Sequence, residues 1–168
     1  MGSHFQVKIR VATAIGLLVG GAVFASAFAQ NAAPPAPPSA SKQAVENRKA
    51  AFTLVGNYFR YFGAVAKGNA PYDEAEATKR AARIAVLAGV VEESFPEGSN
   101  PGEPESKAKA DVWSNRAEFD KKLKAFQADA QALIEVNGKE KGATDAWKAS
   151  VAALAQDCKG CHETYKVK

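Results

Sequence analysis

The last helix-forming segment of the chain, DAWKASVAALAQDCKGCHETYKVK at residues 145–168, carries most of the information about the fold. Weakly polar and apolar side chains recur in it every three or four residues, which places them on one face of an α-helix. They are Trp147, Val151, Leu154, Cys158, Cys161 and Tyr165. The segment therefore predicts an amphipathic helix that presents both cysteines of the chain on its buried face.

Three earlier segments have the same helical spacing. The first carries Val45, Phe52, Val55, Phe59, Phe62 and Ala66; the second carries Ala77, Ala81, Ile84, Ala88 and Val91, with Leu87 beside them; the third carries Phe119, Leu123, Phe126, Ala130 and Leu133. No segment alternates with period two for long enough to predict a strand. The pattern predicts an all-α protein, and a charged content of 24% excludes a polytopic membrane protein.

The breaks between these segments predict how the helices connect. Residues 67–71 (KGNAP) end the first helix, and Pro71 suits the first turn of the second. Residues 95–104 hold three prolines and two glycines and are expected to form a loop, and Asn137-Gly138 is expected to end the third helix. Short connections at both ends and a longer one in the middle predict an antiparallel four-helix bundle over residues 42–168.

The N-terminal 29 residues have the pattern of a secretory signal peptide. Lys8 and Arg10 precede an apolar stretch, residues 11–25, and Ala27-Phe28-Ala29 supplies an A-x-A cleavage pattern. An uncleaved membrane anchor is the alternative, but the apolar stretch is shorter than the ~20 residues that a spanning helix needs. We therefore expect export to the periplasm, cleavage before Gln30 and no stable membrane anchor afterwards.

Residues 30–41 form a proline- and alanine-rich linker between the expected cleavage site and the bundle. Cleavage removes two basic residues and lowers the formal net charge from +4 to about +2. Because no basic run remains, nucleic acid is not an expected partner. Cleavage also removes Met1 and His4, so that the mature chain has no methionine and one histidine, His162.

Cys158-Lys159-Gly160-Cys161-His162 matches C-x-x-C-H, the attachment signature of c-type haem. In such sites the two thiols bind the haem vinyl groups and the adjacent histidine binds the iron. A redox-active C-x-x-C would be expected in a βαβ context, a structural zinc site needs four ligands, and a disulfide at this helical spacing would be strained. The motif predicts one covalently attached haem c per chain, with His162 as the axial ligand.

The opposite side of the iron has no obvious protein ligand. Electron-carrying haems usually have a methionine or a second histidine there, and the mature chain offers neither. A lysine or the N-terminal amine is the remaining alternative, which apolar surroundings would disfavour. We expect a pentacoordinate, high-spin iron whose open face favours small neutral gases, because an anion would be desolvated without a partner.

Arg48 lies on the apolar face of the first helix, between Val45 and Phe52. A buried cation needs a partner, and a haem propionate is a suitable one; the alternative is an arginine that extends to solvent from the edge of the face. Phe52, one turn later, would lie over the distal side of the haem or would simply be a core residue.

These features together resemble the cytochrome c′ family. The resemblance covers nearly all of residues 41–168. The matching elements are Asn47-Arg48, residues 67–73 (KGNAPYD), Phe95 with Gly98-Ser99, residues 109–113 (KADVW) and residues 158–166 (CKGCHETYK). A C-x-x-C-H motif near the end of the last helix of a bundle is more diagnostic than the motif alone.

The resemblance implies a left-handed four-helix bundle in the periplasm, usually a homodimer formed through the first two helices. It implies that Arg48 lies near a propionate, and that Phe52 takes the distal position where low-spin relatives carry a methionine. Lys49 replaces a glutamine that contacts the haem edge, and Lys166 replaces an arginine on the proximal side. Ser106 is a further propionate contact that the resemblance implies.

Two functions follow from this interpretation. The first is a gas-binding haem protein that binds NO, and CO more weakly, with NO buffering or scavenging as the role that the family suggests. The second is an electron-transfer cytochrome with a periplasmic redox partner. An enzyme is not expected, because the mature chain has no second histidine for peroxidase-like acid–base chemistry.

Overall fold

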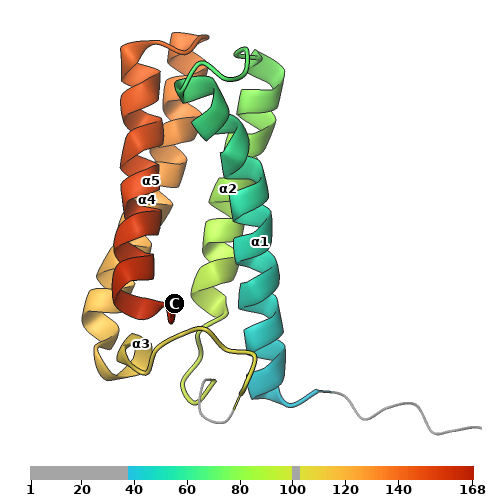
Figure 1. Ribbon diagram of the computed structural model, residues 1–168, viewed down its shortest axis with the longest axis vertical. Helices are drawn as coiled ribbons and strands as arrows, with labels where there is room; N and C mark the ends of the chain where they lie inside the picture. The colour runs from blue at the N-terminus through green and yellow to red at the C-terminus, as the bar shows by residue number, and fades with distance from the viewer. Residues whose placement is uncertain (1–37, 100–102) are drawn as a thin grey trace, which may run out of the picture. The chain divides into compact units, whose positions relative to one another are not determined.

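The computed structural model describes residues 38–99 and 103–168 of the chain. This part contains four long helices and one short one, joined by loops (Figure 1). They are α1 (Ala40–Ala66), α2 (Glu74–Glu93), α3 (Asp111–Ser114), α4 (Arg116–Glu140) and α5 (Asp145–Tyr165). The predicted all-α class and the four main helices are confirmed. The short α3, which the periodicity did not predict, lies in the long connection between α2 and α4.

Side-chain caps define where three of the long helices begin. Ser39 accepts a hydrogen bond from the Lys42 N–H at the start of α1, and Asp73 accepts one from the Glu76 N–H at the start of α2. Thr144 caps α5 in the same way. Each cap satisfies a backbone donor that lacks a helical partner and contributes about 1 kcal/mol.

The helices pack in the order α1–α2–α4–α5, and the core lies between them. The predicted apolar faces of α2 and α4 are almost wholly buried, and at one end of the bundle the rings of Phe62 on α1 and Trp147 on α5 pack 5.9 Å apart. α1 and α5 contact each other far less than the other neighbouring pairs do. The space between these two helices is where the candidate site lies.

Two predicted helix ends are wrong in detail. Pro71 lies three residues before α2, because Asp73 caps that helix instead. Asn137-Gly138 does not end α4, which continues to Glu140 and ends at Lys141 in the left-handed conformation, with φ 47°. Asn137 is buried and its Oδ1 accepts a hydrogen bond from Trp147 Nε1, so tertiary packing outweighs the local preference for a helix end.

The expected signal peptide and most of the expected linker lie outside the described residues, and α1 begins at Ala40. The division into signal, linker and bundle stays a prediction. Within the described ranges, none of the helices is both long enough and apolar enough to cross a membrane.

Candidate haem site

A cavity of about 550 Å³ lies between α1 and α5. Most of its wall is apolar and includes Val55, Phe59, Val91, Phe119, Leu123 and Phe126. The volume falls within the ~300–1,000 Å³ that is usual for small-molecule and cofactor sites. The cavity also explains the weak contact between α1 and α5: a large apolar group placed there would complete the packing of the bundle.

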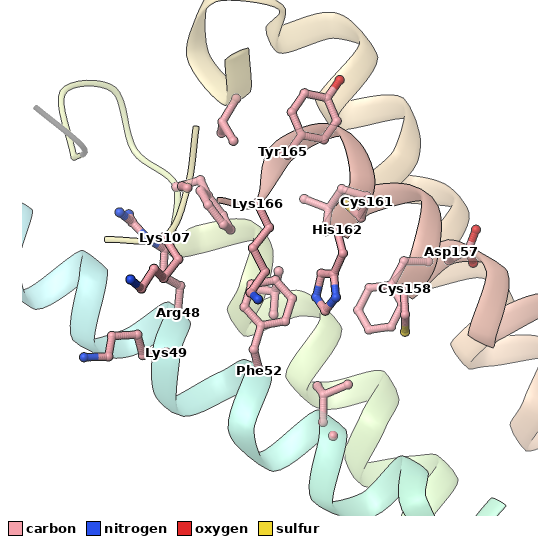
Figure 2. A pocket seen from close by; sticks show the side chains of 18 of the residues that line it. Arg48, Lys49, Phe52, Lys107, Asp157, Cys158, Cys161, His162, Tyr165 and Lys166 are labelled. Carbon is pink, nitrogen blue, oxygen red and sulfur yellow. The ribbon is translucent and has the colours of Figure 1, made fainter. Parts of the chain in front are cut away.

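The two cysteines and the histidine of the C-x-x-C-H motif on α5, Cys158, Cys161 and His162, line this cavity (Figure 2). Cys158 and Cys161 are free thiols and half-buried, and burial is the main reason that the pKa of each thiol is raised. The pKa of His162 is lowered, first by burial and then by the positive charge of Lys166. Both effects favour the neutral imidazole, which is the form that binds a metal.

Arg48 lies on the α1 side of the cavity with only 4% of its surface exposed. Its Nη1 donates to Ser99 Oγ (3.1 Å) and more weakly to the Ser94 carbonyl (3.4 Å). Its Nη2 donates to the Ser99 carbonyl (3.1 Å) and to Ser106 Oγ (2.8 Å). Arg48 therefore joins α1 to the connection between α2 and α4.

The charge of Arg48 is balanced incompletely by these neutral oxygens. The guanidinium also lies over the rings of Phe95 and Trp113, at 5.1 and 5.7 Å from their centroids. Burial lowers the pKa of Arg48, and the charge of Glu103 opposes this effect. A buried guanidinium with mainly neutral partners is a suitable site for an anionic group in the adjoining cavity.

The remaining predicted residues also surround the cavity. Phe52 is 40% exposed and its ring contacts that of Phe95 edge-on, with centroids 6.3 Å apart. Lys49 forms an exposed ion pair with Glu105, so its amine is engaged at the rim. Figure 2 shows the side chain of Lys166 extending into the cavity toward Phe52 and His162.

An isolated antiparallel bridge between Ala108 and Lys166 holds the end of α5 against the loop. The Lys109 N–H donates to the Tyr165 carbonyl, and the Val167 N–H donates to the Lys107 carbonyl, each at 2.8 Å. The bridge fixes the backbone of Lys166 directly after α5, four residues past His162, and it brings Lys107 to the same wall.

Sequence reasoning missed several residues of this site. Ser99 belongs to a stretch that resembles the family, but nothing in the sequence marks it as a partner of Arg48, and no pattern marks Lys107. Asp157, which also lines the cavity, directly precedes Cys158, and that adjacency was a signal that could have drawn attention to it. The loop residues carry no periodicity from which their position could be inferred.

The residues present fit a covalently bound haem. Two free thiols three positions apart, a histidine favoured in its neutral form, a largely apolar cavity and a buried guanidinium on its wall are the chemistry that such a group requires.

Comparisons with known proteins agree with this chemistry. The family model described as Cytochrome C′ matches residues 43–166. The cytochrome c′ of Pararhodospirillum photometricum is 38% identical over 122 residues, which cover 73% of this chain and 94% of that protein. The solved cytochrome c′ of Shewanella frigidimarina is 35% identical with a TM-score of 0.70, over 79% of this chain and all of that one.

One further solved structure bears on ligands. It is the ferrous form of an arginine-to-lysine variant of the cytochrome c′ from Alcaligenes xylosoxidans with bound NO. It is 29% identical, with a TM-score of 0.70, over 79% of this chain and 99% of that one. The family match and these relatives show that the chain belongs to the cytochrome c′ family of non-enzymatic proteins, which carry covalent haem c.

Proposed function

We propose that Cys158 and Cys161 carry the haem through two thioether bonds and that His162 is the axial ligand of its iron. The position of all three on the cavity wall supports this assignment. Arg48, with Ser106 beside it, would hold a propionate, and Lys49 and Lys166 would lie near the haem edge and the proximal side. When bound, the haem supplies an iron centre that takes up one electron and binds small diatomic ligands.

Attachment is testable on the purified protein. The intact mass after denaturation exceeds the polypeptide mass by one haem in the wild type. In Cys158→Ala and Cys161→Ala only one thioether remains, so the haemochrome spectrum in alkaline pyridine shifts to longer wavelength. A Cys158→Ala,Cys161→Ala protein that retains covalent haem would contradict the assignment.

The function that the site supports best is binding of NO, and more weakly of CO, at an open axial position of the iron. The observation that carries this proposal is the composition of the wall: among the described lining residues, His162 is the only histidine, and none is methionine. Phe52 and the neighbouring apolar side chains of the wall would surround the remaining axial side of a bound haem. A neutral diatomic ligand enters such a site without the desolvation cost of an anion.

The proposed biological role is NO buffering or scavenging in the periplasm, after removal of residues 1–29. The relative solved with bound NO supports the ligand. CO and NO titrations of the dithionite-reduced protein, followed in the Soret band, test the binding. A spectrum that neither gas changes would rule the proposal out. The N-terminal residue of protein recovered from the periplasm tests the processing, and Gln30 is expected.

Electron transfer is the second candidate function. Two lysines that line the cavity, Lys107 and Lys166, place positive charge around it, which favours an acidic redox partner. Stopped-flow reduction by candidate donor proteins would distinguish the functions. Reduction that is fast, saturable and weakened by salt supports a redox partner, whereas uniformly slow reduction supports gas binding alone.

The proposed assembly is a homodimer through α1 and α2. A shallow groove on these two helices is lined by Leu54, Tyr58, Ala82, Arg83, Val86 and Leu87. Val86 is 71% exposed and Leu54 is 42% exposed, so apolar surface is available for burial in a partner. A second copy of the chain would present the same groove, as a two-fold interface requires.

Sedimentation equilibrium tests the dimer. Val86→Glu would place a charge in the interface and is expected to shift the protein to monomer. Val167→Glu is the matched control, because Val167 is also exposed but lies after α5, away from the groove. A wild type that is monomeric at micromolar concentration, or a Val86→Glu protein that remains dimeric, would contradict this interface.

A further inference from the structure

Asp157 combines a position on the cavity wall with a buried, unsatisfied oxygen. It lies on α5 directly before Cys158 and beyond that residue as seen from His162 (Figure 2). Its Oδ2 atom is inaccessible to solvent and has no hydrogen-bond donor among the described residues. An ionised carboxylate oxygen in such a position is costly, so the local structure favours a protonated carboxyl group.

The partner for such a proton is on the facing helix. The carboxyl of Asp129 on α4 lies within hydrogen-bonding reach of Asp157. Two carboxylates in contact repel each other, whereas one carboxyl and one carboxylate that share a proton form a strong hydrogen bond. The pKa of Asp157 is raised from 3.8 to about 6, first by burial and then by Asp129, while Lys122 on α4 opposes the shift.

The field of Asp157 reaches the proposed haem attachment points. Its negative charge contributes to the raised pKa of both Cys158 and Cys161. A haem held by these cysteines would lie in the same field. Because electrostatic coupling is reciprocal, the charge of Asp157 would change the free energy of haem reduction by the amount by which reduction changes the free energy of proton binding at Asp157. The other charged groups on the wall of this cavity are Arg48 and Lys49 on α1, Lys107 in the loop and Lys166 after α5.

We propose that Asp157 and Asp129 share one proton and that Asp157 is a redox-linked proton site of this cytochrome. The inference rests on the haem attachment proposed above. Asp157 takes up one proton from water when an external one-electron donor reduces the iron, and it returns that proton on reoxidation. One electron and one proton enter together, so that the net charge around the cavity is conserved.

The midpoint potential of the haem-loaded protein, measured against pH by spectroelectrochemistry, tests the proposal. Since the proton binds more tightly to the reduced form, the wild-type potential falls as pH rises through the interval around 6. A tenfold difference between the two proton dissociation constants corresponds to about 59 mV for a one-electron couple. Asp157→Asn removes this pH dependence, and Asp129→Asn moves it to lower pH because the repelling carboxylate is gone.

Glu135→Gln is the control, because it removes an equal charge from an exposed position on the same helix α4. It leaves the pH profile unchanged. Reduced-minus-oxidised infrared spectra provide a second readout, in which a protonated-carboxyl band appears in the wild type and is absent from Asp157→Asn. This readout does not depend on gas binding.

The proposal is overturned if the wild-type potential is flat across this interval, or if Asp157→Asn keeps the wild-type profile and the infrared band. A protein that lacks covalent haem in the mass measurement refutes the proposed attachment instead. A protein that carries haem but binds no CO or NO refutes the gas-binding function and leaves the proton site open to the same electrochemical measurement, so that the three failures are distinguishable.

Discussion

Replacing Arg48 with leucine should destabilise the bundle, because Arg48 is the main polar link between α1 and the loop before α3. The side chain makes three hydrogen bonds of 2.8–3.1 Å, to Ser99 and Ser106, and a weaker one of 3.4 Å to Ser94. Hydrogen bonds to a charged group contribute ~1.5–3 kcal/mol each, and a stranded buried acceptor costs ~1–3 kcal/mol.

Part of that contribution is offset, because leucine avoids the desolvation of a buried guanidinium. We therefore expect Arg48→Leu to lower the free energy of unfolding by about 2–4 kcal/mol. Arg48→Lys keeps the charge but loses the planar fork that reaches Ser99 and Ser106 together. Its loss should be smaller than that of Arg48→Leu.

Urea unfolding of the haem-loaded protein at pH 7, followed by far-ultraviolet circular dichroism, measures these differences. Arg60→Leu is the matched control, because Arg60 is on the same helix but exposed and pairs only with Asn57 among the described residues. It should change stability by less than about 0.5 kcal/mol. If Arg48→Leu is as mild as Arg60→Leu, the role given to the buried guanidinium is refuted.

Three further perturbations test other parts of the structure. Phe52→Met should supply a sixth ligand from α1, giving a low-spin spectrum and slower CO binding; an unchanged high-spin spectrum would place Phe52 away from the iron. Asp157→Asn should stabilise the protein at pH 7 by about 1 kcal/mol after allowance for solvent screening. Because the pKa of Asp157 is raised, its ionisation costs folding free energy as the pH rises from about 4 to about 6, and the gain should vanish below pH 4. Urea unfolding at both pH values measures the gain, and a gain that is larger below pH 4 than at pH 7 would contradict this prediction. Asn137→Ala leaves the buried Nε1–H of Trp147 without its acceptor and should cost about 1–3 kcal/mol in urea unfolding; a neutral result would mean that water replaces the amide.

Helical periodicity was sufficient to predict the bundle, because each long helix repeats apolar side chains every three or four residues along one face. The positions expected in the core of α2 and α4 are buried as predicted. On α1 the same periodicity cannot separate two environments. Val55 and Phe62 are buried, whereas Phe52 stays 40% exposed beside the cavity, since both kinds of position need apolar side chains.

The candidate site was predictable where a short motif or an anomalous residue marked it. Arg48 stood out as a charge on an apolar face, and the cysteines and His162 stood out by their spacing. Its partner Ser99 did not, because an irregular loop has no period. The contact between Asp157 and Asp129 was not predictable either, since it depends on the relative register of α4 and α5.

The most direct test of the central claim, an open axial position on a haem held by α5, is the visible absorption spectrum of the purified protein, oxidised and then reduced. A high-spin Soret band, with a broad unsplit band in the α/β region after reduction, is the expected result. Sharp, split low-spin bands in the reduced protein would contradict it, because they would show that a lysine or the N-terminal amine occupies the sixth position.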